Sequence, residues 1–130
     1  MACFLVSAAE AAAVTALKKA EEKKEAKEEK DPEAQKITIP MSEKLRWLSN
    51  LLWGGAALLA FEHVWHGEVV PWFPFLTAMN DPADTSEMLH EMSTVGVCMA
   101  LLITAVWFAM CKAADYIVSR PAKQLQKEAV

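Results

Sequence analysis

The sequence of 130 residues lacks basic side chains throughout its centre. All 13 lysines and arginines lie in residues 18–46 or from Lys112 onward, and none occurs between Trp47 and Cys111. Acidic residues do occur in that interval, at Glu62, Glu68, Asp81, Asp84, Glu87 and Glu91. In membrane proteins, short loops rich in lysine and arginine stay in the cytoplasm. The charge pattern therefore predicts that both basic regions lie on the cytoplasmic side of a membrane and the acidic centre on the outside.

Cysteines are few, and catalytic motifs are absent. Cys3, Cys98 and Cys111 are too scattered for a disulfide framework or a C-x-x-C zinc site. The sequence shows no pairing of a nucleophile with a base, no phosphate-binding glycine loop and no established metal signature. The net charge of −4 averages a region of mixed charge with an acidic one, so it supports no nucleic-acid partner. We therefore expect neither an enzyme nor a nucleic-acid-binding protein.

The most prominent feature of the sequence is a long run of residues without a charged side chain. Residues 92–111, MSTVGVCMALLITAVWFAMC, carry no charge and are followed at once by Lys112. As an α-helix these residues are about 30 Å long, which matches the hydrocarbon core of a bilayer. We predict a transmembrane helix over about residues 86–118, with Asp84 and Glu87 as its capping box and Pro121 just beyond its end.

A second apolar segment, residues 45–65, predicts another transmembrane helix, with Ser42 as its N-cap. Small residues lie along both predicted helices, at Gly54 and Gly55 in the first and at Gly96, Ala100 and Thr104 in the second. Because lipid tails are as apolar as leucine, helices in membranes pair through close approach of their backbones. We expect these two small-residue faces to contact each other.

The first seventeen residues are apolar except for Ser7, Glu10 and Thr15. They predict a short N-terminal membrane helix over residues 2–17, and an amphipathic helix lying in the membrane interface is the alternative. A carboxylate within a membrane span is a candidate functional group, which singles out Glu10. On an interfacial helix the same carboxylate would simply face water.

The remaining segments connect these helices. Residues 18–42 are rich in Lys, Glu and Ala and have no apolar face, so we expect a helical or disordered tether in the cytoplasm. In the outer loop, residues 66–84, the side chains of Trp72, Phe73 and Phe75 are too apolar for a free aqueous loop. This loop predicts either a hairpin at headgroup depth or a docking site for a membrane partner. Residues 120–130 would form a cytoplasmic tail.

One group of residues points to chemistry near the outer ends of both predicted spans. It comprises His63, His66, His90, Glu62 and Glu87. Imidazole and carboxylate groups ligate transition metals, and two histidines from facing helices can be the axial ligands of a haem. The alternative is that Glu87 only caps a helix and that His63 and His66 are interfacial residues. We expect no cofactor, and a haem or transition metal is the alternative.

Together these features predict an all-α membrane protein with two transmembrane helices and a shorter N-terminal one. Its N-terminus would lie outside and its C-terminus in the cytoplasm, in the cell membrane. Three thin helices cannot enclose a substrate path, so we expect a homo-oligomer or a subunit of a larger membrane complex. The predicted function is that of a non-catalytic accessory, assembly or interaction subunit. The alternative is a haem- or metal-binding protein that handles electrons or ions.

Overall fold

The computed structural model describes residues 2–28 and 38–129 and confirms the all-α prediction for them. The elements are α1 (Phe4–Glu28), α2 (Met41–Trp65), the 3-10 helix η1 (Thr77–Asn80), α3 (Pro82–Glu91), the π-helical segment η2 (Met92–Gly96) and α4 (Val97–Glu128). Among the described residues, β-structure is limited to one isolated bridge between Val69 and Leu76.

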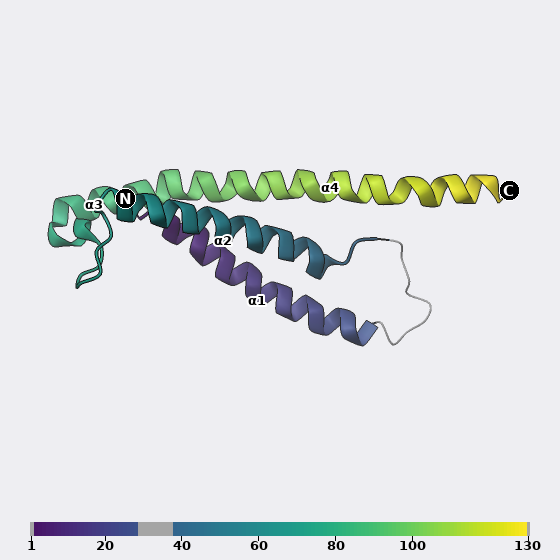
Figure 1. Ribbon diagram of the computed structural model, residues 1–130, viewed down its shortest axis with the longest axis horizontal. Helices are drawn as coiled ribbons and strands as arrows, with labels where there is room; N and C mark the ends of the chain where they lie inside the picture. The colour runs from purple at the N-terminus through teal and green to yellow at the C-terminus, as the bar shows by residue number, and fades with distance from the viewer. Residues whose placement is uncertain (1, 29–37, 130) are drawn as a thin grey trace.

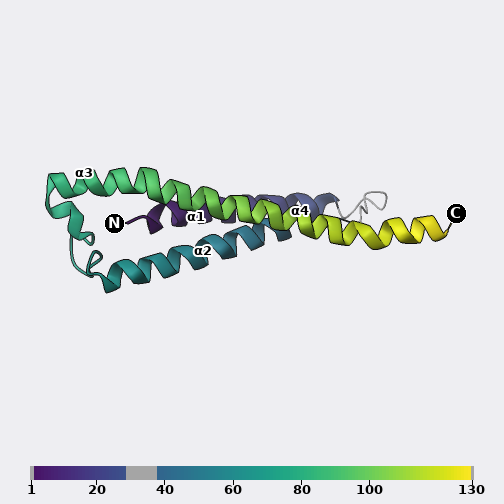
Figure 2. The same ribbon diagram turned by 90° about the horizontal axis from the view of Figure 1, so that it is seen from above.

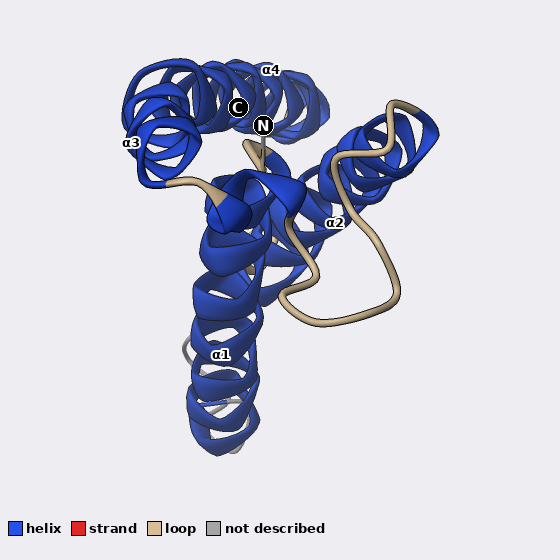
Figure 3. Cartoon of the chain, turned by 90° about the vertical axis from the view of Figure 1, so that its left-hand side faces the viewer, coloured by secondary structure: helices blue, strands red, loops and turns tan. Residues whose placement is uncertain are grey.

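Three helices, α1, α2 and α4, run along the long axis of the molecule (Figures 1 and 2). We call the end that holds residues 66–81 and α3 the loop end, and the opposite end, where α1 stops and α2 begins, the tether end. α1 and α4 run away from the loop end, and α2 returns to it. Seen from the loop end, α1, α2 and α4 lie on different sides of the long axis and diverge from one another (Figure 3). α4 continues past the tether ends of α1 and α2.

The core lies between α1 and α2, and α4 covers it. Its buried residues are Ala11, Val14, Leu45, Leu48 and Leu52, with Ile103 and Trp107 of α4 packed against them. Ala11 and Val14 recur on α1 at helical spacing and have small side chains, which lets α2 approach closely. The hydroxyls of Thr15 and Ser49 lie 3.0 Å apart across the same contact and form a hydrogen bond.

One helix in the described part of the chain is long and apolar enough, by length and composition, to cross a membrane. It is the 39-residue run Pro82–Arg120, which joins α3, η2 and most of α4 and contains the predicted span 86–118. Neither α1 nor α2 combines the length, hydropathy and low number of charges that this requires. Polar residues such as Asn50 and Glu62 lower the hydropathy of α2, and the lysines from Lys18 onward lower that of α1. The structure therefore supports one spanning helix, and the other two spans stay predictions.

The predicted ends of the long helix are wrong. Its capping box was expected at Asp84 and Glu87, but α3 begins at Pro82 and its N-cap is Asp81, whose Oδ1 accepts a hydrogen bond of 2.7 Å from the Ala83 amide. Proline suits the first helical position because its missing N–H would have no partner there. At the other end α4 continues through Pro121 to Glu128, so the expected tail is mostly helix. A proline removes one backbone hydrogen bond, and the helix persists on both sides.

The sequence predicts a boundary between an N-terminal helix at residues 2–17 and a separate tether. In the structure, one helix runs across that position. α1 passes through Lys18 to Glu28 without a break. Lys, Glu and Ala are among the strongest helix formers, so the apolar helix propagates into the charged segment. The part of the predicted tether at residues 29–37 lies outside the described residues.

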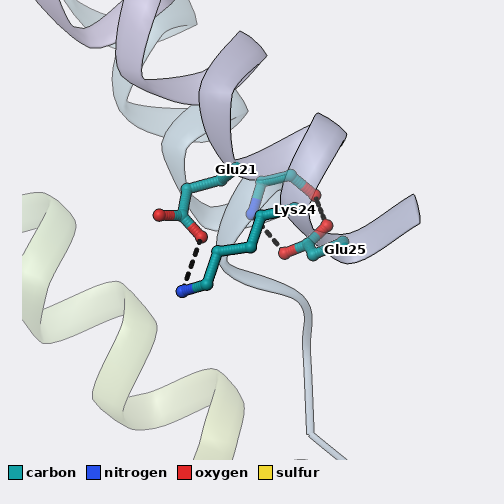
Figure 4. A network of polar contacts seen from close by, with 4 residues as sticks. Glu21, Lys24 and Glu25 are labelled. Carbon is teal, nitrogen blue, oxygen red and sulfur yellow. Dashed lines mark hydrogen bonds and ion pairs between the residues drawn. The ribbon is translucent and has the colours of Figure 1, made fainter. Parts of the chain in front are cut away.

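α2 is capped by α1 rather than by its own Ser42, which was the predicted N-cap. α2 begins at Met41 after Pro40, and Pro40 makes no side-chain cap. The carboxylate of Glu25 instead accepts hydrogen bonds from the Ser42 amide, at 3.1 Å, and from the Ser42 hydroxyl. Figure 4 shows Glu25 on α1 beside Lys24, which pairs with Glu21 at 3.8 Å. The charged part of α1 is thus joined to the first turn of α2.

Candidate functional site

Of the predicted metal ligands, His63 has the most enclosed environment. It lies in the last turn of α2, and only 8 % of its surface is exposed. Its Nδ1 is 2.6 Å from the Leu59 carbonyl oxygen, and its Nε2 is 3.6 Å from a carboxylate oxygen of Glu68. The ring of Phe4, from the start of α1, packs edge-on against the imidazole at 5.4 Å. His63 therefore joins α1, α2 and the loop.

Glu68, the partner of His63, is not among the ligands predicted from the sequence. The sequence does contain a signal for this contact, the glycine just after α2. Gly67 adopts a positive φ of 74°, which glycine reaches without steric cost. The turn at Gly67 folds the chain back, and the Glu68 amide donates to the His63 carbonyl oxygen at 2.9 Å. A glycine just after a helix marks such a reversal in the sequence.

The other predicted ligands do not gather around His63. Glu62, His66, Glu87 and His90 are all exposed. His66 is the C-cap of α2, and its backbone amide donates to the Glu62 carbonyl oxygen at 3.0 Å. Within residues 2–28 and 38–129, no three His, Cys, Asp or Glu side chains are grouped so that they could hold a metal ion. Glu68 is therefore the one carboxylate that pairs with His63 among the described residues, and a bound haem or transition metal stays the untested alternative.

The small residues of the long helix face α1, not the small-residue face of α2. A Cβ atom on Gly96 would lie 2.9 Å from Cγ2 of Val6 on α1. Ala100, one turn further along, is also buried. On α2, a Cβ on Gly55 would meet the Ile103 side chain at 3.5 Å, while a Cβ on Gly54 would meet nothing within 4 Å. The predicted contact between the two small-residue faces is therefore wrong, because α1 takes the close approach to α4.

The third residue of that small-residue stripe, Thr104, meets Glu10. Its hydroxyl oxygen lies 2.6 Å from Oε1 of Glu10 and 2.9 Å from the Ala100 carbonyl oxygen. Glu10 is half-buried on α1, so it faces α4 rather than open water. One turn before it, Ser7 is completely buried, and its hydroxyl has no hydrogen-bond partner among the described residues.

At the tether end, α2 and α4 are joined by polar contacts that link residues far apart in the sequence. The Lys44 ammonium lies 2.7 Å from Oδ2 of Asp115, and only 12 % of the Lys44 side chain is exposed. The indole N–H of Trp107 donates to the Lys44 carbonyl oxygen at 2.7 Å. No local pattern in the sequence identifies this pairing.

The aromatic loop forms a small hairpin. The Val70 amide donates to the Phe75 carbonyl oxygen at 2.8 Å, and the bridge between Val69 and Leu76 closes the turn. The rings of Phe73 and Phe75 pack edge to face at 6.4 Å. Trp72, Phe73 and Phe75 are all exposed, Phe73 by 85 %. The hairpin therefore presents its aromatic side chains outward.

No protein-family model, curated protein or solved structure matches this chain. The function proposed below therefore depends on the chemistry and placement of the chain's own residues.

Proposed function

We propose that this chain is a small integral membrane protein that serves as a non-catalytic accessory, assembly or interaction subunit of a membrane complex. The observation that carries this proposal is the exposure of the helix Pro82–Arg120. Only 17 % of its most apolar window is buried within the chain. In a soluble protein the core would cover such a helix. Here, lipid or another protein must cover it.

Exposed apolar side chains are distributed widely along α4. They include Leu101, Leu102, Val106, Phe108, Met110 and Ile117. The bundle has one thin layer of helices around its core, so it does not enclose a substrate path. A protein of this shape acts through its surfaces. It is a homo-oligomer or is seated against larger subunits.

The proposed orientation places the loop end outside the cell membrane and the tether end, with the C-terminus, in the cytoplasm. Support comes from the charge pattern, since no lysine or arginine occurs between Trp47 and Cys111. In this orientation α1 begins outside and carries its lysines inside. The aromatic hairpin then lies at the outer interface, where tryptophan and other amphipathic side chains are enriched in membrane proteins.

The proposal is tested by extracting membranes that contain the full chain, first with alkaline carbonate and then with a mild detergent. We expect the chain to stay with the carbonate-washed membranes. After affinity purification in detergent, it should run on a native gel as an oligomer or with a stoichiometric second subunit. Recovery in the carbonate supernatant would contradict the membrane placement. A monomer without a partner would contradict the assembly role.

A matched pair of substitutions locates the interaction surface. Phe73→Ala removes the most exposed ring of the hairpin, and we expect it to reduce the amount of associated subunit about tenfold, the loss typical of a central interface residue. Leu89→Ala removes an exposed apolar side chain from α3 at the same end and should leave the complex unchanged. If the two variants assemble equally well, the hairpin is not the contact surface.

A further inference from the structure

The polar contact between Glu10 of α1 and Thr104 of α4 contains one hydroxyl hydrogen and two oxygen atoms that can accept it. The Thr104 hydroxyl lies within hydrogen-bond distance of both Glu10 Oε1 and the Ala100 carbonyl oxygen, at 2.6 and 2.9 Å. A hydroxyl has one hydrogen and two lone pairs, so it donates to one of these oxygens at a time. When it donates to Ala100, its lone pair faces Glu10. The Glu10 oxygen then needs a proton or a cation between the two atoms.

A second polar atom lies on the same face of α1. Ser7 is three residues before Glu10, a spacing that places both side chains on one side of the helix. Ser7 has 0 % exposure, and its Oγ has no hydrogen-bond partner in the described part of the chain. Buried hydroxyls nearly always have a partner, and an ion is one explanation when the protein itself supplies none.

No described side chain neutralises Glu10. In residues 2–28, 38–120 and 127–129, no lysine, arginine or histidine forms an ion pair with it. On α2, the charged group towards the tether end is Lys44, which pairs with Asp115 of α4. The group towards the loop end is His63, which pairs with Glu68.

The other titratable groups that face this contact are also distant along their helices. Cys111 of α4 is buried, but it lies seven residues beyond Thr104, about 10 Å along the helix. On α1 itself, Cys3 and Lys18 are seven and eight residues from Glu10, and η2 contains no titratable side chain. A half-buried carboxylate between apolar helices that has no ion pair with a described side chain is stabilised when a cation neutralises it.

We propose that Glu10 is the central ligand of a site for one monovalent cation, a proton or Na⁺, between α1 and α4. The carboxylate supplies the single negative charge that balances the ion. The Thr104 hydroxyl supplies a second oxygen, and we assign the third to the buried Ser7 hydroxyl, which lies one turn before Glu10 on the same face of α1. Hard cations bind oxygen atoms of these kinds. The site goes beyond the proposed accessory function, which requires no ligand.

The experiment is labelling of the purified full chain in detergent with a hydrophobic carbodiimide, followed by mass spectrometry of the peptide that contains Glu10. A carbodiimide takes up the proton of a carboxylic acid and then adds its carboxylate, so it reports a protonated Glu10. We expect an adduct on Glu10 whose rate of formation falls as the pH rises. An unlabelled Glu10 at every pH, or labelling that is independent of both pH and salt, would overturn the site.

Salt distinguishes the two cations. If Na⁺ is the ligand, added NaCl should slow labelling, whereas choline chloride at the same ionic strength should not. If a proton is the ligand, the two salts should act alike while the pH dependence remains. Slowing by NaCl alone identifies Na⁺ as the ligand. If the two salts act alike, the site is assigned to a proton only when the hydroxyl substitutions described next change the labelling, because any carboxyl reacts more slowly as the pH rises. Because labelling is measured on the purified chain, a failure to find a partner subunit leaves this test unaffected.

Substitutions test the two hydroxyls without removing Glu10. Thr104→Val and Ser7→Ala each delete one oxygen, and we expect each to change the labelling rate at fixed pH and salt by about tenfold, the effect of losing a hydrogen bond to a charged group. Thr15→Val is the control, because its hydroxyl is bonded to Ser49 across the α1–α2 contact. It should label as the unaltered chain does. If all three variants label alike, Glu10 is merely a reactive carboxyl, and the site is overturned.

Discussion

At the scale of the residue, the absence of a side chain at Gly96 sets how closely α4 approaches α1. A Cβ at this position would lie 2.9 Å from Cγ2 of Val6 and 3.4 Å from the Cys3 carbonyl oxygen. Valine is branched at Cβ and has little rotational freedom in a helix, so its methyl group cannot easily turn away. The two backbones are therefore in contact because one residue has no side chain.

We expect Gly96→Ala to destabilise the bundle by about 1–3 kcal/mol, the usual cost of adding a methyl group to a filled contact. Gly54→Ala is the control, since a Cβ there meets nothing within 4 Å and alanine is the better helix former. It should be neutral or stabilising. Thermal unfolding in detergent, followed by circular dichroism, measures both variants. An equal effect of the two substitutions would show that α1 does not pack on Gly96.

At the scale of the element, two polar links hold the helices in register at the tether end. Glu25 connects α1 to the first turn of α2, and the pair Lys44–Asp115 connects α2 to α4. The first four amides of a helix have no partner within the helix, so a carboxylate from a neighbouring helix is stabilising there. In each link the charged partner comes from another helix.

The Glu25 link predicts a pH dependence. The hydrogen bond from the Ser42 side chain is the largest of the effects that lower the pKa of Glu25, and amides at the start of α2 add to it, while partial burial opposes them. Because the pKa is lower in the folded than in the unfolded chain, the stabilisation is full above the usual glutamate range. It is lost as the pH falls through the lowered pKa.

We therefore expect Glu25→Gln to lower the stability of the bundle at neutral pH by at most about 1 kcal/mol, since the carboxylate is only partly buried and water screens its charge. The difference from the unaltered chain should disappear in acid. Glu22→Gln, at an exposed position on the same helix, is the control and should have no effect at either pH. Chemical unfolding at neutral and at acidic pH provides the comparison. A Glu25 effect that persists in acid would contradict the capping role.

The Lys44–Asp115 link should be stronger than the surface pair Arg46–Glu43. Both pairs have N–O distances of 2.7 Å, but the Lys44 side chain is 12 % exposed and that of Arg46 is 57 % exposed. Water screens exposed pairs, and they contribute about 0.2–1 kcal/mol. We expect a double-mutant cycle on Lys44 and Asp115 to give a coupling of about 1–3 kcal/mol, above that of Arg46 and Glu43. Equal couplings would show that Lys44 is solvated.

At the scale of the whole molecule, charge and exposure divide the chain along its long axis. The tether end carries the lysines of α1 and the Lys44–Asp115 pair, whereas the loop end carries acidic residues and the exposed aromatic hairpin. Between them, α4 exposes apolar side chains over several turns. A membrane protein with its loop end outside would have this division.

The orientation can be tested with an impermeant thiol reagent on intact cells that express a variant without its three native cysteines. A cysteine at Asn80, exposed at the loop end, should react from outside. A cysteine at Lys27, exposed near the end of α1, should react only after the membrane is permeabilised. The choice of Asn80 spares the helix cap made by Asp81. Labelling of Lys27→Cys alone in intact cells would reverse the orientation.

The local features of this protein follow from its sequence alone. The uncharged run at residues 92–111 and the strong helix formers around Lys18 suffice to predict the helices, since helix formation depends on spacing and propensity within a few turns. Local capping was harder to predict. Pro82 and Asp81 formed the cap expected at Asp84, because several residues in that segment compete for the role.

Which helix faces meet depends on how the whole helices pack in three dimensions. Gly96 and Thr104 were identified as contact residues, but their partner is α1 and not α2. His63 was identified as a candidate ligand, but its neighbour is Glu68 and not His90. Such pairings depend on the crossing angle and axial register of whole helices. Those quantities result from packing along the entire interface, and the residues of one segment do not encode them.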